Sequence, residues 1–189
     1  MPHIHNFVPG QAEYQTKCAD RIFKIPGIMY CQQNGINKAC AQVALRSLLS
    51  SVLPDQPIPY STLNKIANTP TPNLGLDTGQ IRKILNHFQI TYTDLDYDTP
   101  SGSQLVNSVP YYRFIYGGME SGRGGLVGFS CPGQSSTARH IIPFFGHTFN
   151  QDTWAPRASN AYFKVGATTK YIPSDEWLSS FIGHDDNFG

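Results

Sequence analysis

The sequence predicts an α+β protein, with helices in the first half of the chain and strands in the second. Between residues 39 and 88, three segments carry apolar residues at helical spacing. After residue 90 the pattern changes to short runs rich in aromatic and β-branched residues, separated by glycines and prolines. Helices that precede strands, instead of alternating with them, are typical of an antiparallel sheet packed against a helical layer.

Length and composition are consistent with one domain over residues 1–189. Of the 189 residues 40% are hydrophobic, which is enough for a packed core. Charged residues make up only 14% and the formal net charge is +1, so no basic cluster is present to neutralise phosphates. The apolar runs are too short to cross a bilayer. We therefore expect neither a nucleic-acid nor a membrane partner, and the sequence assigns no oligomeric state.

Cysteine usage and the N-terminus indicate a reducing compartment. Residues 1–5 have neither the charged nor the apolar region of a secretory signal, so we expect a cytoplasmic protein. The four cysteines are Cys18, Cys31, Cys40 and Cys131. This low density, without a CxxC or HxxxH pair, predicts free thiols, no structural zinc site and no cofactor. All except Cys40 are expected to be small buried residues.

The first helix is expected to span residues 39–52. Residues 1–30 before it have an irregular pattern, apart from a short strand over 22–25. The prolines that follow Leu53 end the helix. Its expected apolar face consists of Val43, Ala44, Leu48, Leu49 and Val52.

Two shorter helices are expected over residues 60–67 and 76–88. Ser61 is the expected N-cap of the first, and Asp77 or Thr78 that of the second. Side chains of these types accept hydrogen bonds from the unpaired N–H groups at a helix start.

The second half is expected to supply the sheet. A chain reversal is expected over residues 146–150, and a short capped helix over 174–178. The expected strands cover residues 90–93, 109–116, 126–129, 140–145 and 161–165.

The C-terminal residues carry one further pattern. The run from His184 to Asp186 has the composition of a metal-ligand cluster, but we interpret it as a polar tail. Since the composition does not change before Gly189, we expect a longer protein to continue beyond this residue.

Cys40 is the leading candidate nucleophile. It lies at the junction between a polar loop that carries Gln32 and Gln33 and an apolar helix. The positive end of the helix dipole would favour its thiolate form. His140 begins an expected strand, and Asp152 and Trp154 follow that strand. A nucleophile, a base and an orienting carboxylate, far apart in sequence, form the set that thiol catalysis needs.

This order resembles the papain-like cysteine peptidase superfamily, especially compact bacterial members similar to bacteriocin-processing peptidase domains. Cys40 matches the nucleophile, His140 the base and Asp152 the orienting residue. Gln33, with Gln32 as the alternative, matches the glutamine that binds the oxyanion. Trp154 matches the tryptophan that covers the hydrogen bond between the histidine and its orienting residue. The resemblance implies a papain-like core over about residues 28–165, with the catalytic cysteine at a helix start packed against an antiparallel sheet.

The resemblance implies a thiol hydrolase that cleaves peptide or isopeptide bonds of a peptide or protein substrate through an acyl-enzyme. Two alternatives stay open: an acyl transferase of transglutaminase-like or phytochelatin synthase-like type, and an inactive papain-fold binding domain. His147 competes with His140 as the base, although we expect it in the turn after the strand. Asn150 competes with Asp152 as the third member.

Overall fold

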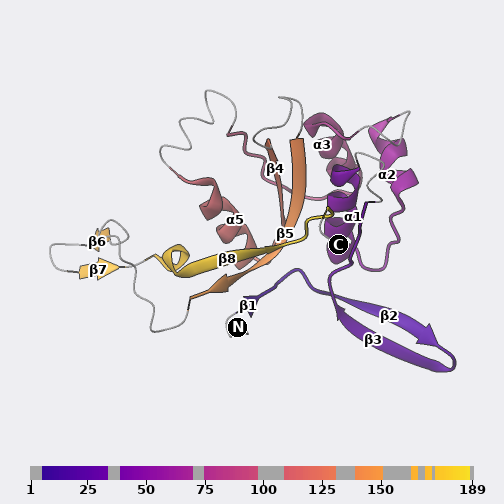
Figure 1. Ribbon diagram of the computed structural model, residues 1–189, viewed down its shortest axis with the longest axis horizontal. Helices are drawn as coiled ribbons and strands as arrows, with labels where there is room; N and C mark the ends of the chain where they lie inside the picture. Colours follow the sequence, from indigo (N-terminus) through magenta and orange to yellow (C-terminus); the bar gives the residue numbers. More distant parts are fainter. Residues whose placement is uncertain are drawn as a thin grey trace.

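The computed structural model describes residues 6–33, 39–69, 75–97, 109–130, 139–150, 163–165, 169–171 and 173–187. Helices α1, α2 and α3 form a layer beside a four-stranded antiparallel sheet. In Figure 1 they lie to the right of β4 and β5, and α5 lies to the left. The predicted α+β class is therefore confirmed. No helix in these ranges is long and apolar enough to cross a membrane.

The three expected helices are present. They are α1 (Cys40–Val52), α2 (Tyr60–Ala67) and α3 (Thr78–His87). Their facing sides form the main core, which consists of Leu45, Leu49, Ile58, Leu63, Ala67, Ile84 and Leu85. Residues 90–93 form no strand, since Ile90 and Tyr92 instead pack against this core from an irregular segment.

Helix α1 is enclosed on most of its sides. Leu45 and Leu49 are 0% and 1% exposed, and even Gln42 and Ser47 are buried. Val52, which was expected on the apolar face, is 50% exposed, so this part of the expected face is wrong. The helix packs on β5 as well as on α2.

The helix caps follow the expectation at one helix only. Asp77 Oδ1 accepts from the Gln80 backbone N–H at 2.8 Å, and Gln80 Oε1 accepts from the Asp77 N–H at 3.0 Å. This reciprocal pair is a capping box at the start of α3. Ser61 does not cap α2, because α2 begins at Tyr60 and Pro59 occupies the N-cap position.

The long strand β5 (Arg139–Phe149) organises the sheet. It pairs with β4 (Gly125–Ser130), β8 (Leu178–Gly183) and β1 (Asn6–Phe7), always antiparallel. The expected strands at 126–129 and 140–145 are confirmed, but β5 continues to Phe149. The reversal expected over 146–150 is therefore not formed. The expected helix at 174–178 is a single 3-10 turn, Ser174–Trp177, that leads directly into β8.

Residues 109–116 form a helix instead of a strand. Helix α5 (Tyr111–Glu120) follows Pro110, and its buried residues, Tyr116 and Met119, are spaced one helical turn apart. Aromatic residues suit a half-buried strand as well as a helix face, so composition alone misassigned this segment.

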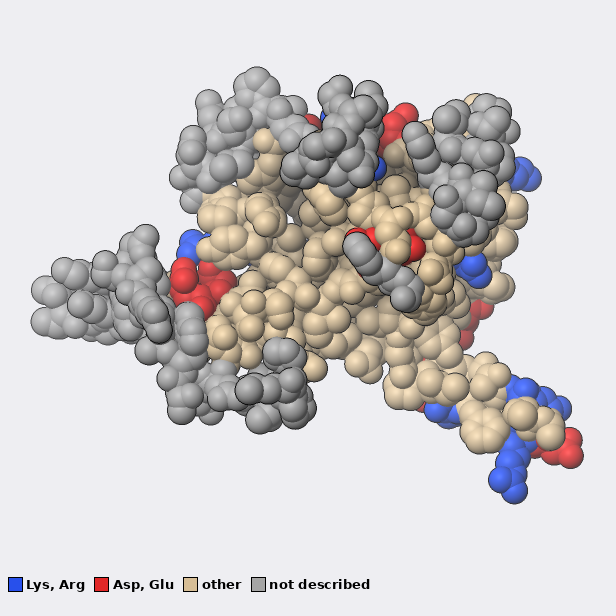
Figure 2. Space-filling model, in the orientation of Figure 1, with Lys and Arg blue, Asp and Glu red and all other residues tan. Residues whose placement is uncertain are grey.

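The N-terminal segment is more regular than expected. Strands β2 (Ala12–Cys18) and β3 (Arg21–Gly27) form a hairpin that extends from the body of the molecule (Figure 1). Basic and acidic side chains lie together on this hairpin, whereas most of the described surface on the visible face is uncharged (Figure 2). A separate small hairpin joins β6 (Phe163–Val165) and β7 (Thr169–Tyr171), which confirms part of the strand expected at 161–165.

The thiols of Cys18, Cys31 and Cys40 are free, as predicted. Cys31 is buried, but Cys18 is exposed at the end of β2, so its expected burial is wrong. Cys131 lies outside the described residues.

Candidate functional site

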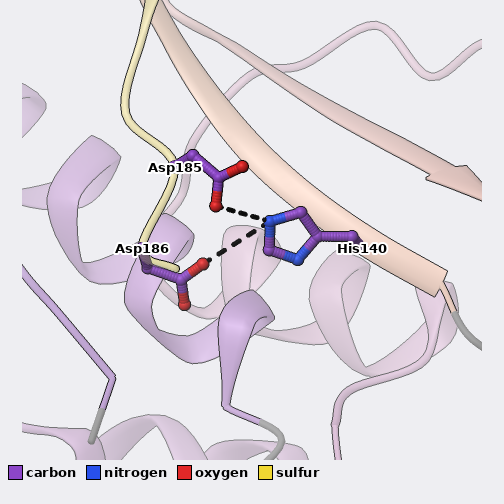
Figure 3. Close-up of side chains that lie close together, drawn as sticks. All are labelled: His140, Asp185 and Asp186. Atoms are coloured by element: carbon purple, nitrogen blue, oxygen red, sulfur yellow. Dashed lines mark hydrogen bonds and ion pairs between the residues drawn. The ribbon is translucent and has the colours of Figure 1, made fainter. Parts of the chain in front are cut away.

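His140 lies between two carboxylates that come from the C-terminal segment. Its Nε2 is 2.9 Å from Asp185 Oδ1 and 3.6 Å from Asp186 Oδ1, and both carboxylates face the ring (Figure 3). An ionised carboxylate can only accept a hydrogen bond, so Nε2 carries the proton that it shares with Asp185. In the neutral ring, Nδ1 then has a free lone pair and can accept a proton.

Strand pairing brings these residues together. In the β5–β8 ladder Gly183 lies opposite Phe144. Beyond β8 the His184 N–H donates to the Pro143 carbonyl at 3.1 Å, so the antiparallel chain continues toward the start of β5. Asp185 and Asp186 therefore reach His140. The interpretation of residues 184–186 as a polar tail is wrong.

Asn187 lies between Gln33 and this histidine and contacts both. Asn187 donates its backbone N–H to Asp185 Oδ1 at 3.0 Å, and its Nδ2 lies 3.2 Å from His140 Nε2. Gln33 Nε2 donates to Asn187 Oδ1 at 2.5 Å. Gln33 thus lies beside the His140 cluster, while Gln32 is exposed. The oxyanion role predicted for Gln33 stays a prediction.

Cys40 is the first residue of α1 and is half-buried. Burial raises the pKa of its thiol, and the nearby charge of Asp186 raises it further. The backbone N–H groups of Ile141, Ala41 and Cys40 itself oppose this by favouring the thiolate. The N–H groups at the helix start favour the thiolate, as expected, but desolvation outweighs them and the pKa of Cys40 is raised.

The contact with Ile141 also places Cys40 relative to the base. Ile141 follows His140 directly on β5, and its backbone N–H is close enough to the Cys40 sulfur to affect the pKa of the thiol. The start of α1 and the start of β5 therefore meet, in agreement with the packing of α1 on β5.

The two adjacent carboxyls differ in their protonation behaviour. Burial opposes ionisation of Asp185, but the Asn187 N–H and the hydrogen bond and charge of His140 hold the pKa of Asp185 below its usual value. Burial raises the pKa of Asp186 despite the opposing charge of His140. Neighbouring groups whose pKa values are pushed apart are typical of functional sites.

Phe129 on β4 contacts the His140 ring from the neighbouring strand. The two residues are opposite each other in the β4–β5 register, and their ring centroids are 5.6 Å apart. The sequence analysis named neither Phe129 nor the C-terminal carboxylates. The apolar residues between 178 and 182 were the available signal for a strand that would carry residues 185–187 back to β5.

The rival residues belong to other environments. His147 is fully buried within β5, with Nε2 2.6 Å from Glu120 Oε1 and with Tyr116 and Phe149 against its ring. Seven residues of extended strand separate it from His140 by about 23 Å. Asn150 donates both its backbone N–H and its Nδ2 to the Trp177 carbonyl. Neither His147 nor Asn150 belongs to the His140 cluster.

Asp152 and Trp154 lie outside the described residues, so their predicted roles stay predictions. Within the described ranges, His140, Asp185 and Asp186 form a group whose potential ligand atoms all lie within 4.8 Å of one another. They are the described residues that could hold a metal ion.

Comparisons of the chain with family models, with curated proteins and with solved structures found no match. A functional proposal for this protein therefore depends on the chemistry of the site.

Proposed function

We propose that this protein is a papain-like thiol hydrolase that cleaves peptide or isopeptide bonds. Cys40 is the nucleophile, His140 the base and Asp185 the orienting carboxylate. The supporting observation is the 2.9 Å contact between His140 Nε2 and Asp185 Oδ1, beside a cysteine that begins a buried helix. Asp185 thus takes the role that the sequence analysis assigned to Asp152.

In this mechanism the Cys40 sulfur attacks the substrate carbonyl while its proton passes to Nδ1 of His140. The Nε2–H bond to Asp185 maintains the required tautomer and stabilises the imidazolium that forms. The imidazolium then protonates the leaving amine, and a thioester remains on Cys40. His140 next accepts a proton from water, the resulting hydroxide releases the carboxylic acid, and the returned proton restores the thiol.

The raised pKa of Cys40 is compatible with this sequence of steps. A thiol that stays protonated in the free enzyme requires a base during attack, and Nδ1 of His140 supplies it. The N–H groups of Cys40 and Ala41 are the proposed oxyanion donors, since the first N–H groups of a helix lack intrahelical partners. Loss of one such donor commonly costs roughly 3–4 kcal/mol.

The test is cleavage of a mixed peptide library, with new termini identified by mass spectrometry. Wild type and a control variant, Asp20→Asn in the exposed β2–β3 turn, should cleave the same peptides. Cys40→Ser should produce no cleavage, and wild type should show a transient acyl adduct on Cys40.

Two other results of this experiment would replace the proposal. Amide products in the presence of added methylamine, without hydrolysis, would assign an acyl transferase. Neither product nor adduct on Cys40 would indicate a non-enzymatic binding domain.

A further inference from the structure

Asp186 is a buried carboxylate whose own oxygens have no described donor. It is 3% exposed, and neither Oδ1 nor Oδ2 accepts a hydrogen bond that meets normal geometry. His140 Nε2 lies 3.6 Å from Asp186 Oδ1, but that imidazole already shares its Nε2 proton with Asp185. A buried carboxylate without hydrogen bonds is costly unless a cation compensates it.

We propose that His140 Nε2 and the carboxylates of Asp185 and Asp186 bind a divalent transition-metal ion of the zinc class. A tetrahedral zinc ion with ligand bonds of about 2.1 Å separates its ligand atoms by about 3.4 Å. The separations of Nε2 from the two carboxylate oxygens, 2.9 Å and 3.6 Å, bracket this value. Small side-chain shifts would therefore complete the ligand set.

The donor types select the class of ion. One imidazole and two carboxylates suit zinc and its first-row neighbours, whereas magnesium and calcium prefer ligand sets made entirely of oxygen. The charge also fits, because two carboxylates neutralise a divalent ion and the ion removes the cost of burying Asp186. Three protein ligands leave one position for water.

Metal binding would switch off the proposed hydrolase, and this consequence rests on the proposed function. The ion takes the Nε2 lone pair, so the proton of the neutral ring moves to Nδ1. Nδ1 then has no lone pair to accept the Cys40 proton, and the thiol is not activated. Chelation of the ion restores the original tautomer and the base.

The test is calorimetric titration of zinc into the chelator-treated full chain. Wild type, Cys40→Ser and the exposed control Asp20→Asn should bind zinc with equal affinity, and magnesium should bind much more weakly. Asp186→Asn should lower the zinc affinity by at least about 10–100-fold, because the loss of a residue that only supports a metal ligand already has an effect of this size. Asp185→Asn should also weaken zinc binding, and this variant replaces Asp186→Asn in the test if Asp186→Asn does not fold.

The outcomes separate the two proposals. Unchanged zinc affinity in both aspartate variants overturns the metal site, whatever the hydrolytic activity. Loss of zinc binding in Cys40→Ser overturns it too, because the thiol would then be the ligand. Zinc binding that needs Asp186, in a protein that cleaves no peptide, supports the metal site and overturns the hydrolase. Full peptide cleavage at saturating zinc overturns the inhibitory role.

Discussion

The Phe129 ring lies edge-on to the His140 ring, with centroids 5.6 Å apart and ring planes at 86°. Because the two residues face each other across β4 and β5, Phe129 restricts the imidazole from one side while Asp185 restricts Nε2. We therefore expect Phe129 to position the proposed base, whereas the resemblance implied that Trp154 covers the hydrogen bond between the histidine and its orienting residue.

Replacing Phe129 should impair the orientation of His140. We expect Phe129→Ala to lower peptide turnover by about tenfold, since edge-to-face pairs contribute about 0.5–1.5 kcal/mol beyond their buried area. Phe129→Leu should recover only part of the loss. NMR signals of the His140 ring should broaden in Phe129→Ala and stay unchanged in Ile22→Ala, which alters an exposed hairpin residue. Equal turnover in all these variants would exclude a positioning role.

The third member of the proposed triad can be identified by comparing two aspartates. Asp185→Ala should reduce turnover by roughly 10²–10⁴-fold, because the imidazole loses the acceptor that maintains its tautomer. Asp185→Asn should retain more activity, since an amide oxygen also accepts from Nε2–H. The measurement is steady-state peptide cleavage, with thermal melting to show that each variant is folded. A large loss in Asp152→Ala, with none in Asp185→Ala, would restore the original assignment.

The reactivity of Cys40 should increase with pH, because burial raises the pKa of its thiol. Its pKa is raised above the ordinary thiol value, so the thiol is mostly protonated at neutral pH and the thiolate predominates only under alkaline conditions. Alkylation of Cys40, followed by peptide mass spectrometry in the presence of EDTA, should be slow at mildly acidic pH and accelerate under alkaline conditions. Rapid labelling at mildly acidic pH that His140→Ala abolishes would instead indicate a thiolate–imidazolium pair in the free protein.

Helix capping provides a test of the fold that is independent of function. Asp77→Ala should lower the free energy of unfolding by about 0.5–2 kcal/mol, because it removes the capping box at α3. Ser61→Ala should change it by a few tenths of a kcal/mol at most, since Ser61 does not cap α2. Urea unfolding monitored by circular dichroism would measure both. A larger effect at Ser61 would show that α2 begins later than Tyr60.

Local periodicity was sufficient to predict the elements that depend on near neighbours. The helices at 39–52, 60–67 and 76–88 were predictable because each buries one face at a fixed spacing. The Asp77 cap is likewise a local hydrogen-bond pattern. α5 was mispredicted because aromatic side chains at Tyr111 and Tyr112 suit a strand equally well, and only the packing of Tyr116 and Met119 selects the helix.

Cys40 and His140 could be selected as the candidate nucleophile and base from their residue types and their positions at the start of a helix and of a strand. The partner of His140 could not be selected in this way, because Asp185 is 45 residues away and reaches it only through the pairing of β8 with β5. The ionisation of Cys40 and Asp186 likewise depends on burial, which no local pattern specifies. Local sequence thus determined the helices and the candidate reactive side chains, whereas strand pairing and desolvation decided which side chains meet and which carry charge.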